Sequence, residues 1–172
     1  MDRGQPELEV IVEIPRGSRN KYEYDHGTDV IRLDRRLFSA TVYPTDYGFV
    51  PGTLAEDGDP LDALVLVEDP TFPGCHVMVR PVGVFRMSDE NGPDAKVLCV
   101  PCQEPRWNGV QDISEVPRDL LAEVRHFFDV YKDPEPGKRT SVHGYEGREV
   151  AWGEVETSRR RYQAASDGPV PP

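Results

Sequence analysis

The chain has 172 residues, of which 37% are apolar and 30% are charged, a balance typical of one soluble globular domain. Its 20 Lys and Arg residues against 31 Asp and Glu residues give a net charge of −11, which opposes general affinity for nucleic acid or anionic lipid. Its apolar runs are too short to span a membrane, and its N-terminus lacks a signal-peptide pattern. Three cysteines, an odd set, do not suggest a disulfide framework. We therefore expect a single cytoplasmic domain over residues 1–172.

Short strands dominate the first hundred residues. Alternating polar and apolar side chains, or in one case a continuous aliphatic run, predict them. The predicted strands cover residues 9–14, 21–24, 30–35, 63–67, 76–87 and 96–100. The last two are joined by residues 88–95, where Asn91-Gly92-Pro93 is a strong turn signal. This pattern favours a small barrel.

Two helices are predicted after the strands. The first follows Pro117, which suits the first turn of a helix, and it ends before Pro134. Its apolar side chains recur at helical spacing at Leu120, Leu121, Val124, Phe127, Phe128 and Tyr131. A weaker helix covers residues 150–164, with Trp152, Val155 and Tyr162 as anchors. Residues 1–6 and 165–172 are expected to be disordered tails.

Three aspartates lie within one short turn, Asp57-Gly58-Asp59-Pro60-Leu61-Asp62. Two like charges about 4 Å apart repel by roughly 4 kcal/mol at an effective dielectric of about 20, so converging carboxylates favour a cation between them. Oxygen ligands suit Mg²⁺, Mn²⁺ or Ca²⁺, and a Mg²⁺ with few protein ligands takes phosphate oxygens as well. The cluster therefore suggests phosphate chemistry.

Two simpler interpretations of this turn are possible. Asp, Gly and Pro are the ordinary residues of a turn with no further role. An EF-hand calcium loop also matches in part, because Asp57, Asp59 and Glu68 fall at its positions 1, 3 and 12. That interpretation fails, since the required glycine is Asp62 and the turn leads into a strand where an EF-hand needs a helix.

Strand periodicity brings charged residues from separate segments to one face. Lys21 and Glu23 share a face because residues two apart in a strand point the same way. Arg35 shares its face with Ile31 and Leu33, whereas Arg32, Asp34 and Arg36 share the opposite face. We therefore expect the Arg35 guanidinium to point inward and meet a carboxylate or phosphate. The alternative is that Arg35 extends its head group to the rim of the barrel.

Other polar groups flank the aspartate turn. Tyr43 and Tyr47 place two phenols just before it, which could bind phosphate or simply pack in the core. A second acidic set, which could equally be a solvated hairpin tip, consists of Asp89, Glu90 and Asp94 beside Lys96.

Nine segments, taken together, resemble those of the soluble inorganic pyrophosphatases of family I, bacterial type, and follow that family's order. They are 11–15 (IVEIP), 20–23 (NKYE), 33–35 (LDR), 43–48 (YPTDYG), 57–65 (DGDPLDALV), 80–83 (RPVG), 87–90 (MSDE), 94–96 (DAK) and 127–133 (FFDVYKD). DGDPxD is that family's signature, and the match covers residues 8–138. After Arg139 the resemblance thins, and no function is carried onto that region.

The resemblance implies a mainly β fold with helices (α+β), an OB-like five-stranded closed β-barrel with two helices packed outside it. It implies hydrolysis of inorganic pyrophosphate to two orthophosphates with several Mg²⁺ ions, with Mn²⁺ or Zn²⁺ as substitutes, and a homohexamer in bacteria. By matched position, the implied metal-binding residues are Asp57, Asp62, Asp89, Asp94, Glu13 and Glu23. The implied substrate-binding or site-lining residues are Lys21, Arg35, Tyr43, Tyr47, Lys96, Tyr131 and Lys132.

The charge of pyrophosphate explains why such a site needs both metals and cationic side chains. Hydroxide is repelled by the substrate until positive charge neutralises its oxygens. Two metals about 3.5 to 4 Å apart can share a water and lower its pKa to about 7. Asp59 lies between two implied ligands, so we predict that it is the general base for this water, with Asp94 as the rival.

Three other functions are alternatives to pyrophosphate hydrolysis. A catalytically silent acidic module that binds metals or anions would have lost one or more site carboxylates or cations, and none is missing. An enzyme of the same fold that cleaves another short phosphoanhydride would be separated by substrate competition. Cys99-Val100-Pro101-Cys102 has the spacing of a redox or zinc motif, but no second pair and no suitable βαβ context accompany it.

Overall fold

Five strands close into a ring in the computed structural model, of which residues 6–168 are described. The strands are β1 (Leu8–Ile14), β4 (Asp46–Phe49), β5 (Asp62–Val65), β6 (His76–Asp89) and β7 (Gly92–Pro101). They pair in the order β1-β4-β5-β7-β6, and β6 pairs back onto β1. The β5–β7 pair is parallel and the others are antiparallel. The expected closed five-stranded fold is confirmed.

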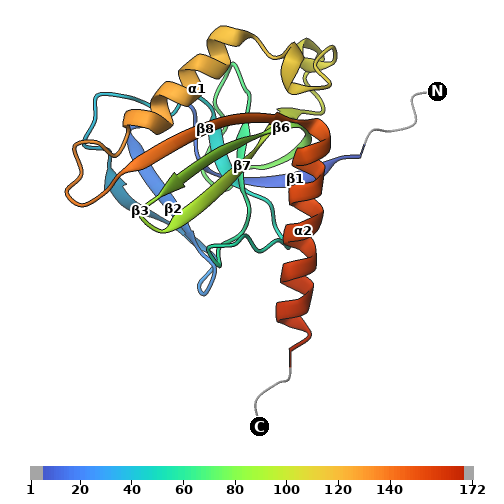
Figure 1. Cartoon of the computed structure of the whole chain (residues 1–172), viewed down its shortest axis with the longest axis horizontal. Helices are drawn as coiled ribbons and strands as arrows, with labels where there is room; N and C mark the ends of the chain where they lie inside the picture. Colours follow the sequence, from blue (N-terminus) through green and yellow to red (C-terminus); the bar gives the residue numbers. More distant parts are fainter. Residues whose placement is uncertain (1–5, 169–172) are drawn as a thin grey trace.

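Three further strands lie outside the ring. β8 (Thr140–Gly147) pairs with the free side of β6, and β2 (Asn20–Asp25) pairs with β3 (Val30–Arg36) as a separate two-stranded sheet. The sequence predicted β2 and β3 as strands but did not predict β4 or β8. The β2–β3 hairpin therefore stands beside the ring rather than within it (Figure 1).

The β6–β7 hairpin is tighter than predicted. Met87 pairs with Asp94, and Asp89 pairs with Gly92, so the strands continue through most of the segment expected to be a loop. Only residues 90 and 91 remain for the turn. This places Asp94 within a strand, where its position is fixed by ladder hydrogen bonds rather than by loop conformation.

Two helices pack outside the ring, as expected (Figure 1). α1 (Arg118–Val130) begins directly after Pro117, and α2 (Arg148–Ser166) starts two residues before and ends two residues after its predicted bounds. Tyr162 is 45% exposed, so it does not anchor α2 as predicted. The tails expected at residues 1–6 and 165–172 fall largely outside the described residues, although residues 165 and 166 are helical. Two short 3₁₀ helices, η1 (Pro105–Trp107) and η2 (Ile113–Glu115), precede α1.

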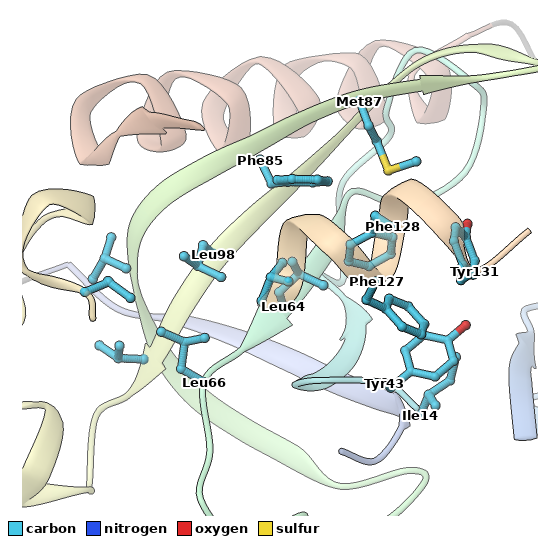
Figure 2. Packing of buried hydrophobic residues seen from close by; sticks show 14 of the residues in the cluster. Ile14, Tyr43, Leu64, Leu66, Phe85, Met87, Leu98, Phe127, Phe128 and Tyr131 are labelled. Carbon is cyan, nitrogen blue, oxygen red and sulfur yellow. The ribbon is translucent and has the colours of Figure 1, made fainter. Parts of the chain in front are cut away.

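Apolar side chains from the ring divide between two buried clusters. Leu64 and Leu98 belong to a cluster that includes Phe127 and Phe128 of α1 (Figure 2). Their neighbours, such as Val65 and Val97, turn the other way into a cluster that includes Val155 of α2. Both faces of the central strands are thus covered, which explains why β5 is a continuous apolar run rather than an alternating one.

Neither described helix could cross a lipid bilayer, since none within residues 6–168 combines the required length with sufficient apolar character.

Candidate active site

A cavity of about 480 Å³ opens where the β2–β3 hairpin faces the ring. It is lined by side chains from β1 to β5, from the β6–β7 hairpin, from the aspartate turn and from the segment after α1. Of the predicted site residues, it brings together Glu13, Lys21, Glu23, Arg35, Tyr47, Asp57, Asp59, Asp62, Asp89, Asp94, Lys96, Tyr131 and Lys132. These residues are spread over more than a hundred positions in the chain, so their convergence is a property of the fold.

Lys96 forms the polar centre of the cavity. Its side chain is 2% exposed, and its Nζ donates to Asp62 Oδ2 at 2.8 Å, to Asp94 Oδ2 at 3.0 Å and to the Tyr47 hydroxyl at 3.0 Å. Burial by itself lowers the pKa of Lys96, but the charge of Asp62 and the neighbouring groups outweigh this, so the net pKa is raised. A permanently charged ammonium is therefore held between two carboxylates.

The cavity holds more carboxylates than its Lys and Arg side chains can neutralise. Burial first, and then the charge of Asp62, raises the pKa of Glu13 to about 8. Burial and the charge of Asp57 raise the pKa of Asp59, and burial is also the largest cause of a raised pKa at Asp94. Nine carboxylate side chains line the cavity against five Lys and Arg side chains. This excess of negative charge favours additional positive charge in the cavity.

The oxygen donors of the cavity fit a hard divalent cation, although their present spacing is not that of a closed metal site. Within the described part of the chain, no three Asp, Glu, His or Cys side chains are close enough to hold an ion. The ammonium of Lys96 stands between Asp62 and Asp94, where it already supplies positive charge. Carboxylate-only donors suit Mg²⁺ and similar ions better than zinc or copper.

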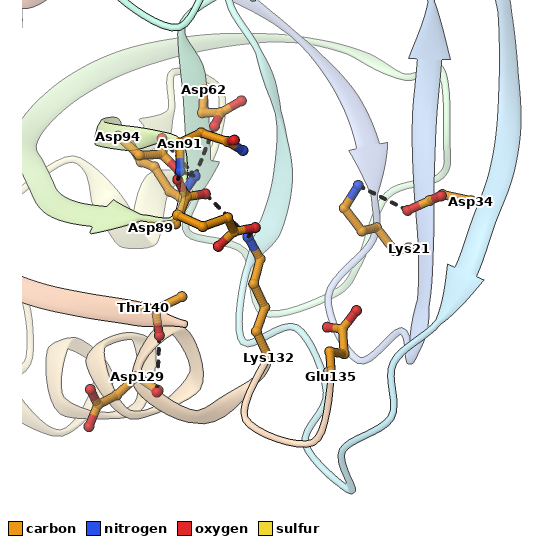
Figure 3. A network of polar contacts seen from close by, with 12 residues as sticks. Lys21, Asp34, Asp62, Asp89, Asn91, Asp94, Asp129, Lys132, Glu135 and Thr140 are labelled. Atoms are coloured by element: carbon orange, nitrogen blue, oxygen red, sulfur yellow. Dashed lines mark hydrogen bonds and ion pairs between the residues drawn. The ribbon is translucent and has the colours of Figure 1, made fainter. Parts of the chain in front are cut away.

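The hairpin forms a second wall of alternating charge. Lys21 pairs with Glu23, which confirms that the two share a face, and its Nζ lies 3.3 Å from Asp34. The Arg35 guanidinium lies between Asp34, at 2.5 Å, and Glu135, at 2.6 Å. Figure 3 shows Lys21 and Asp34 on the hairpin, across from the aspartates of the β6–β7 turn.

A bulge in the hairpin changes the predicted orientation of β3. Lys21 pairs with Arg35 but Tyr22 pairs with Leu33, which leaves Asp34 as the extra residue. Asp34 and Arg35 consequently both line the cavity, whereas Leu33 is 59% exposed. The prediction that Arg35 points inward is confirmed, but the prediction that Leu33 shares its face is wrong.

Lys132 closes the third side of the cavity. It follows α1, its side chain is 9% exposed, and its Nζ lies 3.2 Å from Asp89 and 3.7 Å from Glu90. Figure 3 shows the lysine extending from its loop towards Asp89. The preceding Tyr131 stacks on Phe127, which ties this part of the wall to the core.

Tyr43 departs from its predicted place in the site. It is 2% exposed and is not among the cavity-lining side chains. Its ring packs against Tyr47 and Phe127, with centroids 5.8 and 4.7 Å away. Tyr43 thus packs in the core behind Tyr47, as the simpler interpretation expected, whereas Tyr47 lines the cavity.

Sequence reasoning missed several other residues of the cavity, namely Tyr22, Tyr24, His26, Asp34, Asn91 and Lys138. Asp34 was assigned to the opposite face because a bulge leaves no mark in polar and apolar alternation. Asn91 was interpreted only as part of a turn. Lys138 lies at the end of the matched range but outside the nine segments that carry the resemblance, so no motif pointed to it.

Comparisons with known proteins agree with this geometry. A sequence model described as inorganic pyrophosphatase matches residues 10–163. The inorganic pyrophosphatase of Streptomyces coelicolor is 56% identical over 157 residues, which cover 91% of this chain and 96% of the relative. The crystal structure of inorganic pyrophosphatase from Thermus thermophilus has a TM-score of 0.90 at 47% identity and covers 95% of each chain. The chain belongs to the inorganic pyrophosphatase family.

Proposed function

We propose that the cavity beside the β2–β3 hairpin is where this chain hydrolyses inorganic pyrophosphate to two orthophosphates. The reaction follows from family membership, since the family's sequence model spans residues 10–163, and the chain is an inorganic diphosphatase. The observation that supports this location is the convergence of thirteen of the predicted site residues on one cavity. The alternative of a catalytically silent binding module has no comparable support, because none of the expected carboxylates or cationic side chains is missing from the cavity.

The cationic side chains bind the substrate in this proposal. Lys21 and Arg35 reach the cavity from the β2–β3 hairpin and Lys132 from the segment after α1, and Lys96 lies at its centre. Pyrophosphate has oxygens at both ends, so cations on opposite walls can hold both phosphoryl groups at once. The hydroxyls of Tyr47 and Tyr131 are available as further hydrogen-bond donors to phosphate oxygens.

The carboxylates form the proposed metal site. Asp57, Asp62, Asp89 and Asp94, with Glu13 and Glu23, would hold Mg²⁺ ions, and Mn²⁺ or Zn²⁺ are proposed substitutes. When bound, such ions neutralise phosphate oxygens and lower the pKa of a water. The raised pKa values of Glu13 and Asp94 support this proposal, because a nearby divalent cation would relieve the repulsion that contributes to them.

Asp59 is the proposed general base. The water oxygen bonds to phosphorus, its proton passes to the Asp59 carboxylate, and the bond from phosphorus to the bridging oxygen breaks. The raised pKa of Asp59 makes it a better proton acceptor than an ordinary aspartate. Within residues 6–168 its carboxylate accepts no hydrogen bond, whereas Asp94, the rival, accepts two from Lys96.

The test is phosphate release from pyrophosphate with and without millimolar Mg²⁺, alongside ATP and tripolyphosphate, for the wild type and Asp62→Asn. We expect fast, Mg²⁺-dependent release from pyrophosphate that disappears in the variant. Release that is unchanged in Asp62→Asn would show that the catalytic site lies elsewhere. No release from folded wild-type protein with any tested metal would favour the silent module, and preference for tripolyphosphate would favour another phosphoanhydride as substrate.

We also propose that the enzyme works in the cytoplasm as a homohexamer. The three free cysteines support a reducing compartment, and the hexamer rests on resemblance to bacterial members of the family. Light scattering in dilute solution gives the mass that decides between a monomer and a hexamer.

A further inference from the structure

The Arg35 guanidinium is held by two carboxylates and leaves one nitrogen unpaired. Asp34 Oδ2 lies 2.5 Å from Nη1, and Glu135 Oε1 lies 2.6 Å from Nε. In the described chain Nη2 is buried with neither a hydrogen-bond nor an ion-pair partner, whereas Nε, which also makes no hydrogen bond, keeps its ion pair with Glu135. A guanidinium is planar and rigid, so fixing two of its nitrogens fixes the direction of the third. The unpaired Nη2 has the chemistry to donate to an anion in the cavity.

Glu135 is the less expected of the two carboxylates. Its side chain is 4% exposed, and Arg35 is its ion-pair partner. The second oxygen, Oε2, is buried and has no hydrogen bond within residues 6–168. Burying a carboxylate with one oxygen lacking a hydrogen bond costs free energy, which points to a role of its charge in an ion pair. Glu135 does not line the cavity itself, so any use of its charge passes through Arg35.

The backbone places Glu135 on the same turn as Lys132. The Glu135 amide donates to the Lys132 carbonyl at 2.8 Å, and Lys132 in turn contacts Asp89 on the opposite side. Figure 3 shows this turn, with Lys132 and Glu135 at its two ends. This turn therefore carries Lys132 itself and, through Glu135, also contacts Arg35 of the hairpin.

We propose that Glu135 is a positioning residue, which orients the Arg35 guanidinium so that Nη2 donates to a phosphoryl oxygen of pyrophosphate. Glu135 also links the hairpin to the segment after α1, so Arg35 and Lys132 meet the substrate at a fixed separation. This inference rests on the proposed function, because it requires Arg35 to bind the substrate.

A purely structural ion pair would behave differently from a positioning one. Loss of a structural pair lowers stability but leaves substrate affinity unchanged in the folded protein. Loss of a positioning pair weakens phosphate binding, and only while Arg35 is present. Double-mutant analysis therefore separates the two roles, because residues that act through one another show non-additive effects.

The experiment measures two affinities for four proteins: wild type, Glu135→Gln, Arg35→Ala and the double variant. KM for pyrophosphate comes from phosphate release with saturating Mg²⁺, and the Kd for inorganic phosphate comes from calorimetry. We expect Glu135→Gln to weaken both by about tenfold, equivalent to about 1.4 kcal/mol, with a smaller change in kcat. In the Arg35→Ala background, Glu135→Gln should add no further loss.

Glu154→Gln is the matched control, because Glu154 pairs with Arg86 at 2.9 Å and its side chain is 17% exposed, outside this cavity. It should leave the Kd for phosphate unchanged. Glu135→Asp keeps the charge on a shorter side chain and should give an intermediate loss of phosphate affinity. It replaces Glu135→Gln in the test if that variant does not fold. An unchanged Kd in folded Glu135→Gln or Glu135→Asp, or the same loss with and without Arg35, would overturn the positioning role. If Arg35→Ala itself leaves the Kd unchanged, the proposed substrate-binding role of Arg35 fails instead.

Discussion

At the scale of single residues, Asp59 carries the most specific chemical prediction. Its carboxylate lies in the turn between Asp57 and Asp62, and burial and the charge of Asp57 raise its pKa. Asp59→Asn removes the proton acceptor but keeps the size of the side chain. We expect kcat for pyrophosphate to fall by about 10²- to 10⁴-fold, the usual contribution of a general base. Steady-state phosphate release measures this.

Metal binding provides the control for Asp59. Calorimetric titration with Mg²⁺ should give nearly the same affinity for Asp59→Asn as for the wild type. Asp69→Asn, at an exposed position outside the cavity, should retain full activity. A near-normal rate in Asp59→Asn would remove Asp59 from the role and leave Asp94 as the candidate base.

Glu13 predicts how stability depends on pH when no metal is bound. Burial, followed by the charge of Asp62, raises the pKa of Glu13 from 4.5 to about 8 in the folded protein. Below about pH 4.5 the carboxyl is protonated in both the folded and the unfolded chain, so its contribution to stability is fully present. Between these two values the unfolded chain releases the proton while the folded chain keeps it. Stability is therefore lost as the pH rises through this window.

Urea denaturation in the presence of a chelator, repeated from pH 5 to pH 8, measures that loss. The free energy of unfolding should fall with rising pH in the wild type and fall less steeply in Glu13→Gln, which cannot ionise. Saturating Mg²⁺ should also flatten the wild-type profile, because a cation stabilises the ionised carboxylate. Identical slopes for the wild type and Glu13→Gln would contradict the raised pKa.

Strand periodicity alone placed correctly those residues whose partners lie two positions away in the same strand. Lys21 and Glu23 needed only the two-residue period, and Asp94 and Lys96 needed the same. Asp34 was misplaced because the bulge depends on how β2 and β3 pair, which no local pattern encodes. Glu135 escaped notice because its partner lies a hundred positions earlier in the chain.

At the scale of elements, Gly48 fixes how closely β4 approaches β1. A Cβ at this position would lie 2.0 Å from the Ile11 carbonyl oxygen and 2.9 Å from Val12 Cα, and both are backbone atoms that cannot move aside cheaply. Gly48→Ala should therefore cost at least the roughly 1–3 kcal/mol typical of overpacking, measured by urea denaturation. Because Tyr47 is the adjacent residue, activity should fall as well.

Gly153 provides the opposite case within the same chain. It lies in the middle of α2, and a Cβ there would meet nothing within 4 Å. Gly153→Ala should raise the free energy of unfolding by about 0.5–1 kcal/mol, because alanine loses less backbone entropy in a helix. A Gly48→Ala protein at least as stable as the wild type would show that the close β1–β4 approach tolerates a Cβ.

The elements that the sequence predicted best are those with strong local patterns. α1 has apolar residues at helical spacing and a proline at its start, and its predicted position is confirmed. β8 was missed because the antiparallel partner that stabilises it, β6, lies more than fifty residues earlier. β4 was missed because it is four residues long and contains a glycine, which local propensity disfavours in strands.

At the scale of the whole molecule, the net charge of −11 is concentrated partly around the proposed catalytic cavity, where nine carboxylates meet five cationic side chains. A fold that concentrates like charge in one place is under electrostatic strain that bound cations relieve. The charge balance of the chain predicted the absence of general nucleic-acid affinity, but the position of the excess required the three-dimensional arrangement.

Divalent cations should therefore stabilise the whole protein and not only activate it. A ligand that binds the folded state alone adds about 2.7 kcal/mol at a hundred times its Kd, which raises Tm by roughly 5–10 °C for a chain of this size. Thermal unfolding with Mg²⁺, compared with NaCl at the same ionic strength, measures the specific part of this shift. Asp62→Asn should lose most of the Mg²⁺-specific shift, whereas Asp69→Asn should keep it. An equal shift with NaCl, or a full shift in Asp62→Asn, would mean that the stabilisation comes from general charge screening and not from a site at Asp62.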